Sequence, residues 1–352
     1  MKVVSRSIRS AIAGLILACS PLAMTTAFAK DQLVVDLVNE PSSLDPHKQW
    51  NPDSYYVYRN IFDNLVTRSD AGEIAPQIAT EWKYNSDTEI VFKLRDDVKF
   101  HDGSPLTAKD VAFSINRIIN PAFASPQLGQ FNKIVSAEAT GEHEVTVKTD
   151  GAYPALLAQL VKLSIVPEKI VEAKGDDAFN AAPVGSGPYK FVNWQRGVSV
   201  ALERNDDYWG DKGAFKTAEF RAVPDAATRI ANLQSGTTDL AVGLDADLAA
   251  QIEGSANAKP LSVLTERVGY VKLNPNLPPF DDKRVCEAVA RAIDTEAITE
   301  GVQGGVDQPV AQMVTPSHFG NVEGIEGYDY DFDKAKQIIL DARATGMAVS
   351  FV

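Results

Sequence analysis

Cysteine and histidine are scarce in this 352-residue chain, and their scarcity limits both its stabilisation and its chemistry. There are two cysteines, Cys19 and Cys286, and four histidines that stand far apart in the sequence. None of the histidines has the close ligand spacing of a zinc site. We therefore predict no metal and no cofactor, and we expect stability to come from a packed core.

The first 29 residues have the pattern of a secretory signal. Lys2, Arg6 and Arg9 precede an apolar run that reaches Met24 and is followed by Ala27-Phe28-Ala29. The run is shorter than the roughly 18–20 apolar residues that a membrane-spanning helix needs. We predict that residues 1–29 are a signal peptide and that the chain is exported. A lipid anchor at Cys19 ranks second, because Leu17 is bulky for a lipoprotein cleavage site.

Positive charge is also in short supply. The formal net charge is −13, and loss of the signal peptide with its three basic residues would leave −16. Such a surface repels nucleic acid and anionic lipid, so we expect no nucleic-acid partner. Because Cys19 would leave with the signal, Cys286 would be alone and no intrachain disulfide could form.

Strand-like and helix-like patterns alternate along the rest of the chain, which indicates an α/β or α+β class. Apolar residues at every second position predict strands in five places: Leu33–Leu37, Ile90–Leu94, Val145–Val147, Val198–Leu202 with a partner at Tyr189–Val192, and the long run Leu261–Leu273. Helices are expected after Asp225, ending before Gly236, and after Asp281 or Asp282.

The stretch FHDGSPLTAKDVAFSINR, residues 100–117, sets a histidine beside an aspartate and invites a catalytic interpretation. Adjacent residues on an extended chain point to opposite faces, so His101 and Asp102 would not converge on a substrate. We predict a structural role instead: Asp102-Gly103 forms a turn, and Thr107 with Asp110 forms a capping box.

Two further motifs are given structural interpretations. Gly185-Ser186-Gly187 lacks the glycine before it that a serine-hydrolase elbow needs, and we expect its glycines to let the chain bend. The early aromatic cluster, Trp50 to Phe62, is expected to lie mostly in the core, with no particular member touching a ligand.

The C-terminal residues raise the expectation of a truncated chain. A helix is predicted over Asp333–Ala344, and the following residues, up to Val352, have the pattern of a strand that ends with the chain.

Four stretches together resemble one known family. They are residues 74–118, 183–210 (PVGSGPYKFVNWQRGVSVALERNDDYWG), 220–240 (FRAVPDAATRIANLQSGTTDL) and 273–294. Their order and spacing are similar to those of bacterial extracellular solute-binding proteins of the dipeptide, oligopeptide and nickel type, which serve ABC-type importers.

The resemblance implies an α/β, two-lobed periplasmic binding protein with mixed sheets and flanking helices, which closes on its ligand by hinge bending. We expect lobe one to span residues 30–271, including an extra subdomain, and lobe two to begin at residue 272. Family members continue well beyond residue 352, so the second lobe over 272–352 is expected to be incomplete. Cys286 and Phe332 depart from the residues that are usual in the family.

The resemblance also implies candidate ligand-binding residues. The loop after the first strand matches a segment that lines the cleft in relatives, where backbone groups pair with an extended peptide. An ordinary turn is the alternative interpretation of this loop. The candidates are Glu40, Ser42, Ser43 and Leu44 in this loop, Phe131, and Asn274 near the expected hinge.

The sequence therefore predicts a non-enzymatic, monomeric binding protein in the periplasm. It would deliver short peptides to the membrane permease and ATPase subunits of an ABC importer. The alternatives are a truncated, non-functional product of a binding-protein gene and a binder of a nickel chelate, haem, glutathione or glycan. A secreted hydrolase ranks last, because no nucleophile and base are paired in the sequence.

Overall fold

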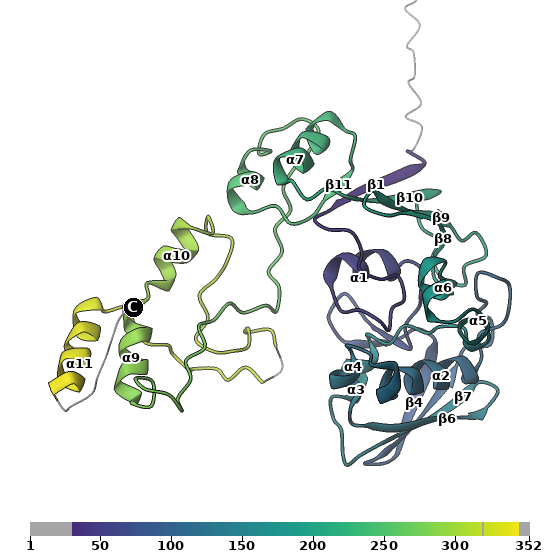
Figure 1. Cartoon of the computed structure of the whole chain (residues 1–352), viewed down its shortest axis with the longest axis horizontal. Coiled ribbons are helices and arrows are strands. Elements are labelled where there is room, and N and C mark those ends of the chain that lie inside the picture. Colours follow the sequence, from purple (N-terminus) through teal and green to yellow (C-terminus); the bar gives the residue numbers. More distant parts are fainter. Residues whose placement is uncertain (1–29, 319, 345–352) are drawn as a thin grey trace, which may run out of the picture.

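In the computed structural model, which describes residues 30–318 and 320–344, the strands form three sheets within residues 30–241 (Figure 1). The predicted signal peptide, Cys19 and the strand expected after Gly346 lie outside the described residues. The largest sheet has the order β11 (Leu240–Ala241), β1 (Gln32–Leu37), β10 (Thr217–Ala222), β9 (Ser199–Arg204) and β8 (Tyr189–Gln195).

This five-stranded sheet is mixed. Strand β1 pairs in parallel with both β10 and β11, whereas β10 with β9 and β9 with β8 are antiparallel. The sheet packs on α1 (Pro52–Tyr58), α5 (Glu168–Lys174) and α6 (Asp176–Ala181) through a core that contains Leu37, Tyr58 and Phe179. The prediction of mixed sheets with flanking helices is confirmed.

A second sheet has the antiparallel order β4 (Ala79–Ser86), β5 (Glu89–Leu94), β7 (Glu144–Thr149) and β6 (Ile134–Gly141). Helix α2 (Ala108–Ile119) packs on β6 and β7, and the apolar faces of α2 and the sheet form a second core. Short elements complete this region: β2 (Val66–Arg68), β3 (Ile74–Pro76), η1 (Pro121–Phe123), α3 (Leu128–Phe131) and α4 (Leu156–Leu160).

The expected start signals are confirmed for three helices. The Asp110 carboxylate accepts from Thr107 N at 2.9 Å, so the capping box of α2 forms. Asp225 caps α7 (Ala226–Ser235), which ends at the left-handed Gly236, and Asp282 caps α9 (Lys283–Ala292). These capping signals depend on residues close together in sequence, so they can be recognised before the fold is known.

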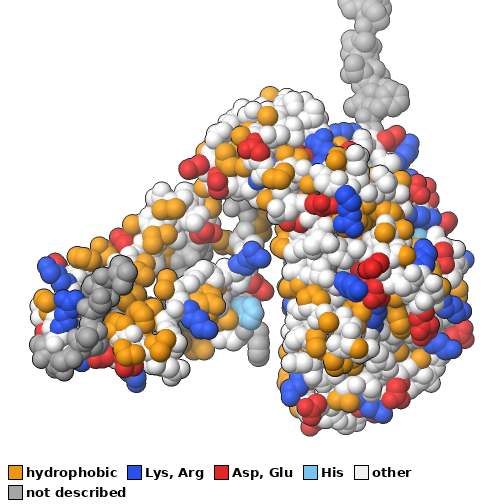
Figure 2. Space-filling model, viewed as in Figure 1, with side chains coloured by type: hydrophobic (Ala, Val, Ile, Leu, Met, Phe, Trp, Pro, Cys, Tyr) orange, Lys and Arg blue, Asp and Glu red, His pale blue; other side chains and the backbone are white. Residues whose placement is uncertain are grey.

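The chain then leads away from the sheets. After α8 (Ala246–Ala250) it runs through an extended segment to α9, α10 (Thr295–Gly301) and α11 (Phe332–Ala344), where α9 and α11 pack together (Figure 1). We call residues 30–250 the sheet body and residues 274–344 the helical arm. Figure 2 shows an open gap between them over the lower part of the view. The predicted lobe boundary at 271 and 272 falls in the extended segment and stays a prediction.

Two expected elements differ in the structure. No strand forms over Leu261–Leu273, where Leu261 and Val263 are 86% and 70% exposed, because no described strand pairs with this run. Alternation alone does not satisfy the backbone hydrogen bonds of a strand. The β8–β9 loop is also tighter than expected, since Asn193 and Trp194 belong to β8 and the turn centres on Gly197, with φ +72°.

Candidate functional site

The loop that follows β1 leaves the sheet at an edge shared with two other strands. Because β1, β10 and β11 run in parallel, their carboxyl ends lie together. In open sheets with parallel strands, ligands bind in the crevice outside these ends. The segment Glu40–Leu44, four of whose residues were predicted from the sequence to contact ligand, therefore lies at an edge suited to binding.

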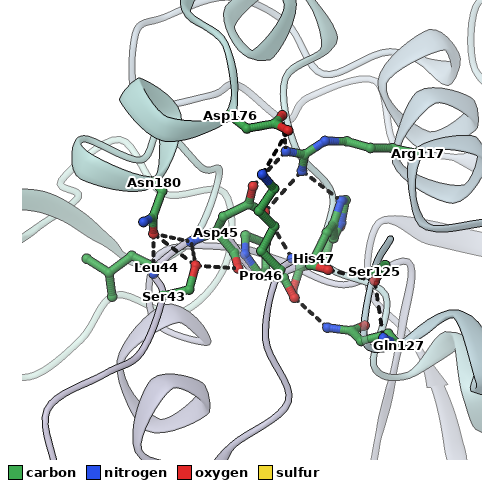
Figure 3. A network of polar contacts seen from close by, with 12 residues as sticks. Ser43, Leu44, Asp45, Pro46, His47, Arg117, Ser125, Gln127, Asp176 and Asn180 are labelled. Atoms are coloured by element: carbon green, nitrogen blue, oxygen red, sulfur yellow. Dashed lines mark hydrogen bonds and ion pairs between the residues drawn. The ribbon is translucent and has the colours of Figure 1, made fainter. Parts of the chain in front are cut away.

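Backbone N–H groups of this loop are held by the protein itself (Figure 3). Asn180 Oδ1 accepts from Leu44 N at 2.7 Å and from Asp45 N at 3.1 Å. Ser54 Oγ accepts from Ser42 N at 3.0 Å and from Ser43 N at 3.4 Å. In contrast, no hydrogen bond among the described residues uses the carbonyl oxygen of Glu40 or Ser42. The loop thus has a fixed shape and retains acceptors for a ligand.

An ion-pair network centred on the buried Arg117 and Asp45 supports the loop (Figure 3). The Arg117 guanidinium donates to both carboxylate oxygens of Asp45, at 3.0 and 2.6 Å, and to Asp176 at 2.7 Å. Lys48 lies 3.0 Å from Asp176, and Arg117 stacks 4.1 Å from the ring centroid of Phe123. Arg117 and Asp45 are buried, so the pair is protected from solvent screening. A bidentate pair of this kind fixes both position and orientation.

His47 completes the network as a neutral ring. Its Nε2 is 2.8 Å from Ser164 O and its Nδ1 is 3.2 Å from Arg117 Nη1. Because a carbonyl can only accept and a guanidinium can only donate, Nε2 carries the proton and Nδ1 accepts. Burial, opposed by Asp45 and reinforced by Arg117, lowers the pKa of His47 to about 4. The ring is therefore a structural hydrogen-bonding group at neutral pH.

Glu40 is engaged by the β8–β9 hairpin. Its carboxylate accepts from Trp194 Nε1 at 2.9 Å, and Arg196 Nη1 lies 3.8 Å away. The Arg196 guanidinium also lies 3.3 Å from the Trp194 ring centroid. These contacts tie the loop after β1 to the far edge of the five-stranded sheet and partly neutralise the Glu40 carboxylate.

The predicted site residues do not all share one surface. Glu40 is half-buried and Ser42 is exposed, whereas Ser43, Leu44 and Phe131 are buried. Phe131 is the last residue of α3, and its side chain packs in the core formed with the four-stranded sheet. Asn274 is exposed at the start of the helical arm, and its Oδ1 accepts from Asn276 N at 3.1 Å. The structure brings the four loop residues together and places Phe131 and Asn274 apart from them.

His101 and Asp102 have the structural roles predicted for them. Asp102 Oδ1 accepts from Ser104 N at 3.0 Å, closing the turn. His101 Nε2 donates to Gly187 O at 3.0 Å, and its Nδ1 accepts from Gly185 N at 3.3 Å. Burial lowers the pKa of His101 to about 4. The His101 ring thus holds the glycine segment in place through two hydrogen bonds.

The Gly185-Ser186-Gly187 segment bends as expected, since residues 186–188 form a bend directly before β8. Neither glycine has a positive φ. The structure adds a second role: a Cβ at Gly185 would overlap Ile61 O, so glycine is required for close backbone approach. Ser186 Oγ donates to the buried Asp63 at 2.9 Å, alongside Gln77, Tyr208 and Trp209. Burial raises the pKa of Asp63, and these four donors oppose that effect.

The described residues, 30–318 and 320–344, contain no group of three or more His, Cys, Asp or Glu side chains that could hold a metal ion. Within the same ranges, no helix has the length and apolar character needed to cross a membrane. Cys286, the one cysteine in these ranges, is half-buried with Sγ 3.5 Å from Phe280 O.

A body of mixed sheets with flanking helices, joined by an extended segment to a second, helical part, is the architecture of a periplasmic binding protein, and comparisons give the family. A family model described as Bacterial extracellular solute-binding proteins, family 5 Middle, matches residues 73–348. The chain belongs to this family, and the resemblance seen in the sequence is confirmed.

Individual relatives support the same assignment. Heme-binding protein A of Haemophilus influenzae is 26% identical over 331 residues, covering 86% of this chain and 59% of the relative. The periplasmic oligopeptide-binding protein OppA of the same organism is 27% identical over 313 residues, covering 82% and 58%. The structure of AppA from Bacillus subtilis in complex with a nonapeptide matches with a TM-score of 0.76 and 26% identity, covering 88% of this chain and 64% of that one. The chain thus spans somewhat less than two thirds of the length of these proteins.

Proposed function

We propose that this protein is the periplasmic binding component of an ABC importer and that it carries short peptides to the permease and ATPase subunits. It acts as a monomer, without catalysis, and releases its ligand unchanged. Export by the N-terminal signal would place it in the periplasm. Family membership supports this proposal, as do the names of the relatives that bind oligopeptides.

The observation that carries the proposal is the arrangement of the loop after β1. Its N–H groups at Ser42 to Asp45 are bonded internally, while the carbonyls of Glu40 and Ser42 have no partner among the described residues. An extended peptide can donate its own N–H groups to such carbonyls, as in strand addition at a sheet edge. Because the loop is already ordered by the Arg117 network, binding costs little ordering entropy at this side of the cleft.

Contact with both lobes would convert binding into closure. A ligand shifts an equilibrium between open and closed forms only by its differential affinity for them. In Figure 1, β1 ends on the side of the sheet body nearer the helical arm, so a peptide held at this edge would also be able to touch the second part. The closed form would then be the one presented to the permease.

Isothermal titration of the purified protein with di- to pentapeptides tests the proposal. We expect saturable binding by at least one peptide length. Bound peptide should add RT ln(1 + [L]/Kd) to the free energy of unfolding and so raise the melting temperature. Free amino acids at the same concentration serve as the control. Absence of heat and of any thermal shift across the whole peptide set would reject peptide binding.

A further inference from the structure

One lysine of the sheet body has an arrangement suited to an anion. Lys162 follows α4, and its Nζ lies 5.0 Å from the ring centroid of Trp50 and 3.3 Å from Gln130 Oε1. Trp50 directly precedes Asn51, the N-cap residue of α1, and Gln130 belongs to α3. In Figure 1, α1, α3 and α4 lie on the side of the sheet body that faces the helical arm. Helix α4, which the lysine directly follows, therefore lies on the face turned toward the helical arm.

Lys162 has no carboxylate partner in the part of the chain that the structure describes. Arg196, at the hairpin near Glu40, differs in this respect because a carboxylate lies 3.8 Å from it. The Lys162 side chain is partly buried, and burial, followed by the nearby Arg68, lowers its pKa. An ammonium has three donors, and one of them is used by Gln130. Two donors thus remain on a partly desolvated cation, which an incoming anion would stabilise.

Lys162 is connected with the candidate peptide segment through Trp50 and its sequence neighbour Asn51. Asn51, next to Trp50 in sequence, donates from Nδ2 to Ser42 Oγ at 2.6 Å. Gln130 is next to Phe131 in sequence, and its carbonyl accepts from Tyr153 Oη at 3.1 Å. Trp50 itself is 45% exposed, so an indole face remains available for apolar contact beside the ammonium. A ligand that lies along Ser42 and Trp50 would meet Lys162 at its end.

We propose that Lys162, seated on Trp50 and oriented by Gln130, is a specificity-determining residue that binds a carboxylate of the ligand. This inference rests on the proposed function, because it assigns one end of the bound peptide to one side chain. Peptides offer two carboxylate sources, the C-terminus and an acidic side chain, with the same chemistry. Charge-assisted hydrogen bonds of this type are stronger than those between neutral groups.

Titrations with three peptides separate these sources. The peptides are trialanine, trialanine amide and Ala-Glu-Ala amide, and the proteins are wild type, Lys162→Gln, Lys162→Arg and Lys83→Gln. Lys83 is an exposed lysine on β4 and serves as the matched control. We expect Lys162→Gln to raise the Kd for the peptide that carries the recognised carboxylate by about 10- to 100-fold. Lys162→Arg keeps the charge and should retain most of the affinity.

Trialanine amide, which has no carboxylate, completes the test. It should bind wild type weakly and Lys162→Gln equally weakly, because the group that the lysine recognises is already gone. Tighter binding of trialanine identifies the C-terminus as the source, and tighter binding of Ala-Glu-Ala amide identifies the side chain. If wild type binds peptides but Lys162→Gln and Lys83→Gln bind them alike, the inference is wrong while the proposed function stands. If wild type binds no peptide at all, both fail.

Discussion

The Arg117 guanidinium lies 2.6 Å from the Asp45 carboxylate, and both side chains are buried although the residues are 72 positions apart in sequence. This pair joins α2 to the loop after β1. It therefore holds the candidate ligand-binding segment against the helix and its core. Because neither charge reaches solvent freely, each depends on the other for its stabilisation.

Replacing Arg117 by Met should destabilise the fold by about 3–5 kcal/mol, because the Asp45 carboxylate would stay buried without its cation. Urea unfolding measures this free energy. Lys93→Met is the matched control, since Lys93 pairs with Glu81 at 3.0 Å on the exposed surface; it should change the free energy by less than about 1 kcal/mol. Equal effects of the two substitutions would contradict the importance of the buried pair.

Stability should fall as the pH decreases from neutral toward 4. His47 and His101 have pKa values lowered from 6.5 to about 4 in the folded chain, mainly by burial. Below pH 6.5 the unfolded chain takes up protons that the folded chain does not, so the stabilisation is complete above 6.5 and is lost as the pH falls toward 4. Each histidine contributes on the order of 3 kcal/mol to this change.

Denaturant titrations between pH 4.5 and 8 check the pH dependence. His47→Gln should flatten the curve by removing one of the two contributions, whereas Asn193→Ala, at an exposed position and with no titratable side chain, should leave the curve of the wild type intact. A curve for His47→Gln that is as steep as that of the wild type would show that His47 does not titrate as its burial implies.

Local sequence signals predicted much of the fold. The capping pairs at Thr107–Asp110 and Asp225–Thr228 lie three residues apart, and the turn at Asp102–Ser104 spans two. Each depends on neighbours in the chain, so its chemistry is visible before any tertiary contact is known. The strands with buried alternate residues, such as β5 and β7, were also predicted for this reason.

Long-range features were not predictable in the same way. His47 was interpreted only as one of several isolated histidines, yet it bonds Arg117 from 70 positions away and Ser164 from 117. Likewise, nothing local in sequence relates Trp50 to Lys162, and Trp50 was expected to be one aromatic residue among many in the core. The only available signal was the cluster of aromatic residues itself, which does not say which member is exposed.

Gly187→Ala should destabilise the chain although both residues are small. An added Cβ would lie 2.7 Å from Asn60 O and 2.8 Å from Ile61 C, so backbone would have to move. Overpacking of this kind costs about 1–3 kcal/mol or more. Gly129→Ala is the control, because a Cβ there has no atom within 4 Å. Thermal unfolding compares the two; a melting temperature for Gly187→Ala at or above that of Gly129→Ala would refute the steric explanation.

Asn180→Ala should loosen the loop after β1 more than it destabilises the whole chain. Asn180 Oδ1 accepts from Ser43 Oγ at 2.9 Å, from Leu44 N at 2.7 Å and from Asp45 N at 3.1 Å. Loss of this acceptor leaves buried donors unpaired, at a cost of about 1–3 kcal/mol. Amide exchange at Leu44 and Asp45 should therefore become faster, while exchange in β5 and β7 changes less.

The same substitution connects loop order with binding. If a peptide binds the Glu40 and Ser42 carbonyls, a loop that must first be ordered will bind it more weakly, because the ordering entropy is then lost on association. Asn193→Ala is the matched control, since Asn193 is an exposed asparagine on β8. Faster exchange at Leu44 with unchanged peptide affinity would mean that the loop is ordered for folding alone and that the ligand is held elsewhere.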